Sequence, residues 1–242
     1  MDNTTTIALS RLAAQSRAID VTATNIANAS TPGYRAQRVL FSDWLLPEAT
    51  GKEKTLAYTQ DRATYQVREP GALSQTGNPL DLAIGNGDAW FQVQTPGGVK
   101  LTRAGHFTLD QRGTVVDSDG NALLDRGGRP MQVATTDAAL TVAGDGTLSS
   151  ENGQIGSIGL VTPNNPATML PEGARLFDTA GGTTPVTAPR LTQGALEESN
   201  VQPITELNRM TDTLREFQFT TQFVQAESDR QQNAIDKIIQ KG

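Results

Sequence analysis

The pattern of apolar and polar positions divides this chain into two helical ends and a strand-rich middle. Near the N-terminus, apolar or small residues recur at alternating steps of three and four, the spacing of one face of an α-helix. This stripe consists of Leu9, Leu12, Ser16, Ile19, Ala23 and Ile26. The opposite face is polar, so the pattern predicts an amphipathic helix that needs a partner along one side. We expect it to stop before Pro32, because proline cannot continue a helix.

The same heptad spacing returns near the C-terminus, after a proline at 203 that is suited to a first helical turn. It predicts a long second helix with the stripe Leu207, Met210, Leu214, Phe217, Thr221, Val224, Ser228, Gln231, Ile235 and Ile238. A second stripe, Phe219, Phe223 and Ala226, lies off the first and indicates contacts with more than one neighbour. Two interpretations stay open: the terminal helices form a hairpin within one chain, or they also pack against copies in other subunits.

Between residues 72 and 190 the period changes to two, which is typical of β-strands. The apolar positions of this alternation include Leu80, Leu82, Ile84, Phe91, Val93, Val99, Leu101, Phe107 and Leu109. Turn-forming residues at 85–87, 96–98 and 118–121 separate these strands, so we expect a chain of antiparallel hairpins.

These patterns predict an α+β fold in which the N- and C-terminal helices pair as a coiled-coil-like domain with an inserted all-β domain of antiparallel hairpins. The expected boundaries are 1–35 plus 195–242 for the helical domain and 72–194 for the β-rich domain. Residues 36–71 are expected to form an exposed connection or ribbon.

Composition narrows the classes of function. The formal net charge is −6 and the basic residues are scattered, so neither nucleic acid nor an anionic membrane is an expected partner. The chain has no cysteine, which excludes disulfides and thiolate metal sites. No apolar run is long enough for a membrane span, and the first residues lack the pattern of a cleaved secretory signal.

Candidate chemistry is sparse. His106 is the only histidine, and we expect it to be a surface or turn residue rather than a catalytic base. Asp81 and Asp88 could in principle form an acid/base pair, but the sequence defines no pocket around them. Arg103, next to Gly105, is expected to bridge strands or to meet a carboxylate of a neighbour. The sequence therefore predicts no catalytic residue and no cofactor.

The segment Asp117-Ser118-Asp119-Gly120-Asn121 resembles the opening of a calcium loop. However, its glycine stands at the fourth position rather than the sixth, and Gly128 occupies the place of the closing glutamate. A β-turn is the better interpretation, so no metal site is predicted.

Three motifs carry a family likeness. The segment "IDVTATNIANASTPGYR" resembles the N-terminal signature of flagellar basal-body rod and hook proteins. The segment "TGNPLDLAIGNGDAWFQVQTPGGVKLTRAGHFTLD" resembles their central β motif, and "GALEESNVQPITELNRMTDTLREFQ" resembles their C-terminal signature. Because the three motifs occur in order and cover most of the chain, the sequence is identified as a member of this axial protein family. Its start, its Thr-Pro-Gly-Tyr and its length resemble the proximal rod group more than the distal rod or hook groups.

The resemblance implies a structural subunit of the flagellar rod and not an enzyme. It implies self-assembly with neighbouring proximal and distal rod proteins, passage through the flagellar export apparatus without a cleaved signal, and a place in the basal body in the periplasmic space. The residues that we expect at the assembly interface are Leu9, Leu12, Ile19, Ile26, Leu207, Met210, Leu214, Phe217, Val224, Ile235 and Ile238.

A signature turn is expected where the first helix stops. It consists of Asn25, Asn28, Pro32, Gly33 and Tyr34, and we expect the two asparagines to bond backbone groups that the helix end leaves unpaired. The alternatives are a distal rod or hook-type axial protein, or a β-rich periplasmic binding module or hydrolase whose terminal helices form only an intramolecular hairpin.

Overall fold

The computed structural model describes residues 3–47, 55–137 and 139–239. The chain forms two compact units. The helical unit consists of Met1–Ala27, Gln37–Val67 and Gln202–Gly242, and the β-rich unit consists of Asn28–Ala36 and Arg68–Val201. Helices at both ends and a mainly antiparallel β middle confirm the α+β class. Residues 37–67, part of the segment expected as an exposed connection or ribbon, group with the helices.

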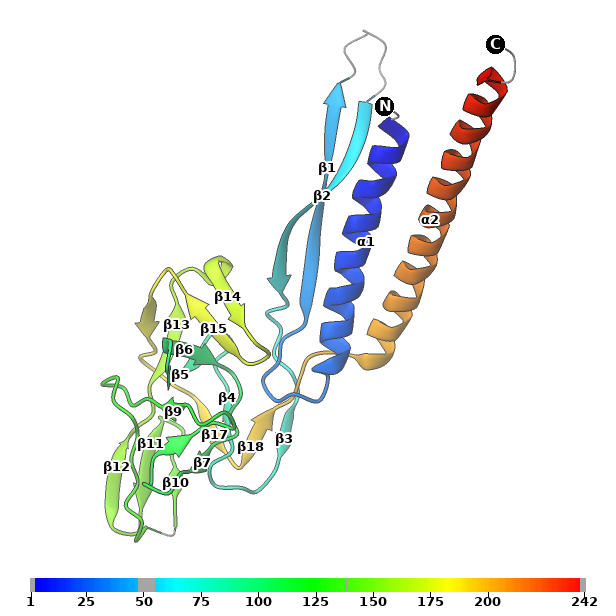
Figure 1. Ribbon diagram of the computed structural model, residues 1–242. Coiled ribbons are helices and arrows are strands. Elements are labelled where there is room, and N and C mark those ends of the chain that lie inside the picture. The colour runs from blue at the N-terminus through cyan, green and yellow to red at the C-terminus, as the bar shows by residue number, and fades with distance from the viewer. Residues whose placement is uncertain (1–2, 48–54, 138, 240–242) are drawn as a thin grey trace. The chain divides into compact units, whose positions relative to one another are not determined.

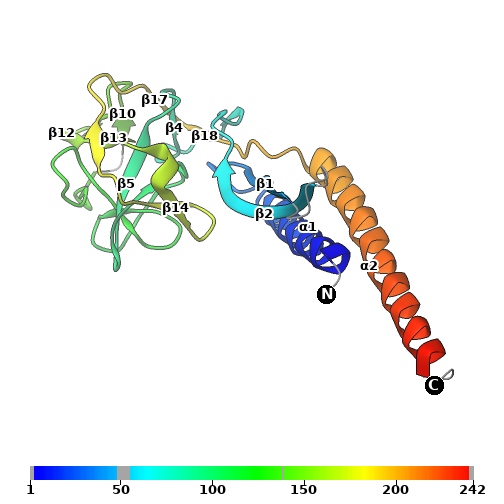
Figure 2. The ribbon, with the colours of Figure 1, turned by 90° about the horizontal axis from the view of Figure 1, so that it is seen from above.

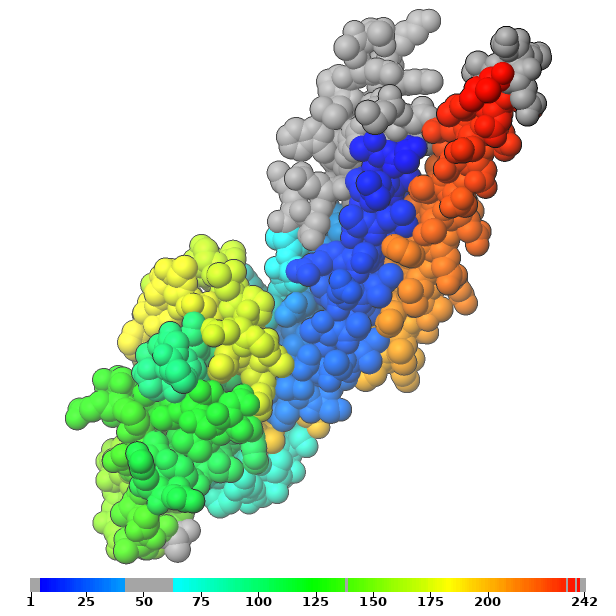
Figure 3. All heavy atoms as spheres, in the orientation of Figure 1, coloured from blue at the N-terminus to red at the C-terminus, as the bar shows by residue number. Residues whose placement is uncertain are grey.

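The helical unit contains two helices and a long hairpin (Figure 1). Helix α1 (Asn3–Ala27) and helix α2 (Pro203–Ile239) run side by side in opposite directions (Figures 1 and 2). Strands β1 (Gln37–Pro47) and β2 (Thr55–Gln66) pair antiparallel and pack on α1. In the space-filling view the atoms of α1 lie beside those of α2 (Figure 3).

The β-rich unit is built from short antiparallel strands. Its elements are β3 (Leu73–Gln75), β4 (Leu82–Ile84), β5 (Trp90–Thr95), β6 (Gly98–Thr102), β7 (Thr108–Leu109), β8 (Val115–Val116), β9 (Ala122–Leu123), β10 (Thr141–Val142), β11 (Thr147–Ser150), β12 (Gly153–Ser157), β13 (Leu160–Pro163), the 3-10 helix η1 (Pro166–Thr168), β14 (Met169–Glu172), β15 (Leu176–Thr179), β16 (Thr183–Pro185), β17 (Leu191–Gln193) and β18 (Ala195–Glu197).

The order of these strands agrees in part with the expected hairpins. Strands β5 and β6 form a hairpin closed by Pro96-Gly97, and β8 and β9 are joined across residues 117–121. The turn at 85–87 is different: it follows β4, which pairs with β17 rather than with β5. Strand β17 comes from the far end of the β-rich sequence, a long-range pairing that local alternation does not encode.

One turn design recurs in this unit. Asp110, Asp117 and Asp125 each accept hydrogen bonds from the backbone N–H groups two and four residues later. Each is followed at the third position by a glycine with positive φ, for example Gly120 at 83°. An aspartate that organises its own turn needs no ion. The segment that resembles a calcium loop is therefore a β-turn, as predicted.

The main core lies inside the β-rich unit. Its fully buried members include Leu82, Phe91, Phe107, Leu123 and Leu148. The rings of Phe91 and Phe107 meet edge to face, with their centroids 5.2 Å apart. The predicted apolar alternation therefore identified core positions in β4 and β5, although the intervening Ala83 of β4 is buried as well.

Candidate assembly surface

One face of α2 is turned toward α1. Its buried or half-buried residues are spaced by four and three, which keeps them on one side of the helix. This α1-facing stripe consists of Glu206, Met210, Thr213, Phe217, Thr220, Val224, Glu227 and Gln231. It shares Met210, Phe217, Val224 and Gln231 with the heptad predicted from the sequence.

The other predicted α2 positions lie elsewhere on the helix. Leu207 and Leu214 each follow a member of the α1-facing stripe by one residue, about 100° around the helix, and remain 50% and 38% exposed. Ile235 is exposed too, whereas the side chain of Ile238 is outside the described residues. The sequence did not predict Glu206 in the stripe. A buried carboxylate is unfavourable unless hydrogen-bond donors or positive charges surround it, and the heptad pattern gives no sign of such partners.

On α1 the predicted stripe is only partly covered. Leu9 is 64% exposed, whereas Leu12, Ile19 and Ile26 are half-buried. The buried residues among the described side chains of α1 are instead Ala8, Ala14, Gln15, Val21, Thr22 and Asn25. A helix with neighbours on two sides buries two adjacent faces, so one heptad does not describe it.

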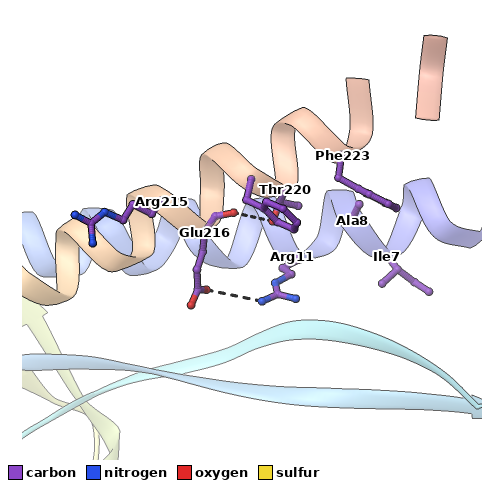
Figure 4. Close-up of a pocket in the computed structure, with 8 residues that line it drawn as sticks. Ile7, Ala8, Arg11, Arg215, Glu216, Thr220 and Phe223 are labelled. Atoms are coloured by element: carbon purple, nitrogen blue, oxygen red, sulfur yellow. Dashed lines mark hydrogen bonds and ion pairs between the residues drawn. The ribbon is translucent and has the colours of Figure 1, made fainter. Parts of the chain in front are cut away.

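A groove lies between the two helices. It has a volume of about 540 Å³ and is lined by Ile7, Ala8, Arg11, Arg215, Glu216, Phe219, Thr220 and Phe223. Figure 4 shows Phe223 and Ile7 at one end of the groove and the Arg11–Glu216 pair beside it. The nearest charged atoms of that pair are 3.8 Å apart. Phe219 and Phe223 are 74% and 46% exposed, so the aromatic wall faces open space.

A buried carboxylate ties the helical unit together. Glu206, in the first turn of α2, accepts hydrogen bonds from Arg38 at 2.7 and 2.9 Å, from Arg209 at 2.8 Å and from Asn25 at 3.1 Å. Burial opposes the charged form, but the donors from Arg38 and Asn25 outweigh it and hold the pKa of Glu206 below its ordinary value. The cluster joins α1, β1 and α2.

The signature residue Asn25 bonds the backbone of β1 through its side chain. Its side chain donates to the carbonyl of Gln37 at 2.9 Å and accepts from the Gln37 N–H at 2.8 Å. These two bonds are made to β1 rather than to the end of the helix that carries Asn25. The amide instead acts as a backbone mimic for β1, which returns beside the helix. Asn28 accepts a bond from the Thr31 hydroxyl through its side chain.

The rest of the signature turn belongs to the β-rich unit. The turn is closed by bonds from Thr31 N–H to the Asn28 carbonyl and from Tyr34 N–H to the Thr31 carbonyl. Gly33 has a φ of 71° and donates its N–H to the Glu197 carbonyl at 2.7 Å. Tyr34 is buried. Glycine is required here because other residues adopt this backbone at a cost.

A second charged cluster is buried beside that turn. Arg103 lies 3.1 Å from the Glu197 carboxylate, and its guanidinium also donates to the carbonyls of Asn86 and Gly87. Arg35 approaches the same carboxylate at 3.6 Å. Burial lowers the pKa of Arg103 to about 10, against the raising effect of Glu197. Arg103 therefore bridges segments within one chain, which was one of the two expected roles.

The remaining candidates for chemistry also have structural roles. The Nδ1 atom of His106 lies 2.6 Å from the carboxylate of buried Asp81, which also accepts bonds from Thr76 and Asn78. Asp81 therefore organises the turn before β4. His106 is partly exposed, but it is fixed by this contact rather than free at the surface.

The described ranges contain no cluster of three or more potential metal-binding side chains. None of the helices in that part of the chain carries an apolar stretch sufficient to cross a bilayer. The prominent surface feature is thus an array of exposed apolar side chains on two packed helices, which is typical of a structural subunit that binds other proteins.

Comparison with known proteins agrees with this class. Three family models match the chain: "Flagella basal body rod protein" at residues 6–35, "Flagellar hook protein FlgE/F/G D1 domain" at 83–150, and "Flagellar basal body rod FlgEFG protein C-terminal" at 192–237. They cover α1 with the signature turn, part of the β-rich unit, and α2 with the strands before it.

Similar proteins extend the match over the full length. A flagellar basal-body rod protein FlgF of Mesorhizobium japonicum is 34% identical over 100% of both chains. Proteins of the same name from Caulobacter vibrioides and Rhizobium meliloti are 31% and 32% identical, over 98% and 97% of this chain and 98% and 95% of their own. The chain belongs to the flagellar basal-body rod protein family. It is a structural protein of the rod and not an enzyme.

Proposed function

We propose that this chain is a subunit of the proximal flagellar rod that polymerises through its terminal helices, with the β-rich region 72–194 as an outer domain. The observation that carries the proposal is the exposure of large apolar side chains on α1 and α2. Leu9, Leu207, Leu214, Phe219 and Ile235 are all exposed, although the helices already pack on each other. Large apolar side chains that gather on the exposed surface of packed helices are typical of sites that bind other proteins.

The expected interface residues divide into two groups on this basis. The exposed group, Leu9, Leu207, Leu214 and Ile235, is available to other subunits. The half-buried group, Leu12, Ile19, Ile26, Met210, Phe217 and Val224, supports the coiled-coil-like pairing of α1 with its neighbours and offers its remaining surface to a further helix.

The partners are copies of this chain and the adjoining proximal and distal rod proteins. Each subunit offers different surfaces to the copies on either side, and such heterologous contacts give open helical assemblies. We further propose that the chain reaches the periplasmic part of the basal body through the flagellar export apparatus, without cleavage of a signal peptide. The proximal assignment is supported by the common name of the three full-length relatives.

The test is electron microscopy of basal bodies from a strain that lacks the gene, with swimming scored in the same cells. The proposal predicts a rod that stops short and cells that do not swim, both restored by the gene on a plasmid. A complete rod without a hook would place the chain in the hook group, and normal flagella would refute the rod function.

A further inference from the structure

Two arginines share one aromatic ring inside the β-rich unit. The guanidinium carbons of Arg35 and Arg103 lie 5.4 and 5.6 Å from the centre of the Trp90 ring. At such distances the face of an aromatic ring attracts a cation. Both arginine side chains are almost fully buried, 4% and 0% exposed, and both face the carboxylate of Glu197, which is 2% exposed. The cluster therefore holds two positive charges against one buried carboxylate.

The two arginines are held to different degrees. Arg103 donates to three backbone carbonyls of the segment 84–87 and lies 3.1 Å from the Glu197 carboxylate. Arg35 donates to the Gly87 carbonyl at 3.1 Å and lies 3.6 Å from the same carboxylate. The buried Nε atom of Arg35 has no hydrogen-bond partner among the described residues. Arg103 is thus built into its surroundings, whereas Arg35 is bound through fewer and longer contacts.

The polar groups around Arg35 have other partners. Without Arg35, Glu197 still has Arg103 and the Gly71 N–H, and the Gly87 carbonyl still accepts from Arg103. Removal of Arg35 therefore leaves no buried acceptor unpaired and leaves one arginine for one carboxylate. In the occupied state, burial lowers the pKa of Arg35 against the raising effect of Glu197. Trp90, Glu197 and the Gly87 carbonyl are consequently a set of partners that is complete before Arg35 arrives.

Arg35 belongs to the segment 28–36, whose two ends lead to α1 and β1. Beyond those ends, the side chain of Asn25 bonds the backbone of Gln37 at 2.8 and 2.9 Å. This double bond closes the base of a loop. Toward its tip, Gly33 donates its N–H to the Glu197 carbonyl at 2.7 Å. The loop therefore presents Arg35 to the cluster much as a bound peptide presents an anchor side chain.

We propose that Trp90, Glu197 and the Gly87 carbonyl form a guanidinium-binding site, and that Arg35 is its built-in ligand rather than part of its framework. The ligand class is an arginine side chain presented on a glycine-containing loop. A guanidinium suits the site better than an ammonium group, because its planar fork bonds a carbonyl and a carboxylate while it stacks on a ring. The proposal does not depend on the rod function.

Chemical rescue of the full chain tests the site. Arg35→Ala removes the atoms of an ethylguanidinium ion, so ethylguanidinium is the probe. Trp44→Phe in every variant leaves Trp90 as the single tryptophan, and its fluorescence reports occupancy. Ethylammonium, which has the same charge without the fork, is the matched ligand control. Arg112→Ala, which removes an exposed arginine of the same unit, is the matched protein control.

The proposal predicts a saturable change in Trp90 fluorescence when ethylguanidinium is added to Arg35→Ala, with half-saturation at about 1–10 mM. Ethylammonium should bind at least about tenfold more weakly. The chain with Arg35 in place and Arg112→Ala should show no saturable change, because Arg35 fills their sites. At saturation, ethylguanidinium should restore at least half of the urea midpoint that Arg35→Ala loses.

Four results would overturn the proposal: no saturable change in Arg35→Ala, an equal response to ethylammonium, an equal response when Arg35 is present, or binding that leaves the urea midpoint unchanged. If Arg35→Ala does not fold by itself, it is refolded in each salt and its circular dichroism is compared. Refolding in ethylguanidinium alone supports the site, whereas refolding in both salts or in neither refutes it.

Discussion

Replacement of Gly33 by alanine should destabilise the β-rich unit through two separable effects. The first is the backbone: φ is 71°, in the left-handed region where a Cβ atom costs about 1–2 kcal/mol. The second is space: an added Cβ would lie 2.4 Å from the carbonyl carbon of Arg103 and 2.5 Å from the nitrogen of Ala104. These are backbone atoms beside a buried ion pair, so relief requires the turn to move, at about 1–3 kcal/mol.

Gly128 provides a matched control. Its φ is 76°, yet an added Cβ would meet nothing within 4 Å. Gly128→Ala therefore carries the backbone cost alone, and the effect of alanine on the unfolded chain is common to both variants. Gly33→Ala should lower the free energy of unfolding by about 1–3 kcal/mol more than Gly128→Ala.

The assay is urea unfolding followed by the fluorescence of buried Trp90, in a background where Trp44 is phenylalanine. Trp90 reports on the β-rich unit, because it packs edge to face on Phe177 with ring centroids 5.1 Å apart. Equal midpoints for Gly33→Ala and Gly128→Ala would refute the close approach of the signature turn to Arg103.

Two further perturbations address the buried charges. Because the pKa of Glu206 is held down in the folded state, the unfolded chain takes up the proton first as the pH falls. The stability due to this carboxylate is present above about pH 4.3 and is lost below it. Glu206→Gln should therefore make the loss of helical circular dichroism between about pH 5 and 3 less steep than in the natural chain. An unchanged acid transition would count against the cluster. Arg103→Met should cost about 3–5 kcal/mol in the same urea assay, because it leaves Glu197 buried with a weaker partner; a loss under about 1 kcal/mol would show that the pair does not matter to the fold.

Local pattern predicted most of the elements of the fold. The heptad spacing predicted both helices, because the apolar positions of an amphipathic helix repeat every three or four residues and can be recognised within the segment itself. The alternation gave strands such as β4, β5 and β6 and core positions such as Phe91 and Phe107. Turn residues gave the β5–β6 hairpin, whose Pro96-Gly97 sequence closes it within two residues.

Long-range contacts were beyond local pattern. The pairing of β4 with β17 joins residues about a hundred positions apart, and no local signal specifies it. The segment of β1 and β2 was expected only as an exposed connection or ribbon, and its packing on α1 is a contact with a distant part of the sequence. Glu206 was overlooked for the same reason: its burial depends on Arg38 and Asn25, which come from distant parts of the sequence.

The sequence predicted that α2 packs on α1 but not which face of α2 makes the contact. At several positions the inward residue is one position away from the predicted one. Leu207 and Leu214 fit an inward stripe by apolarity, whereas the structure turns Glu206 and Thr213 toward α1 and leaves the two leucines exposed. A helix with apolar residues on several flanks satisfies more than one heptad, so the sequence alone cannot choose which flank meets the partner within the chain.

The most direct test of assembly through α2 is incorporation of the double variant Leu207→Asp/Leu214→Asp into basal bodies. Both leucines are exposed, so the isolated chain should keep its circular dichroism and its urea midpoint. Burying carboxylates in an apolar contact costs several kcal/mol, so the variant should be absent from basal bodies and its cells should not swim. Leu170→Asp, at an exposed leucine of the β-rich unit, should be incorporated normally. Equal incorporation of both variants, with normal swimming, would contradict assembly through α2.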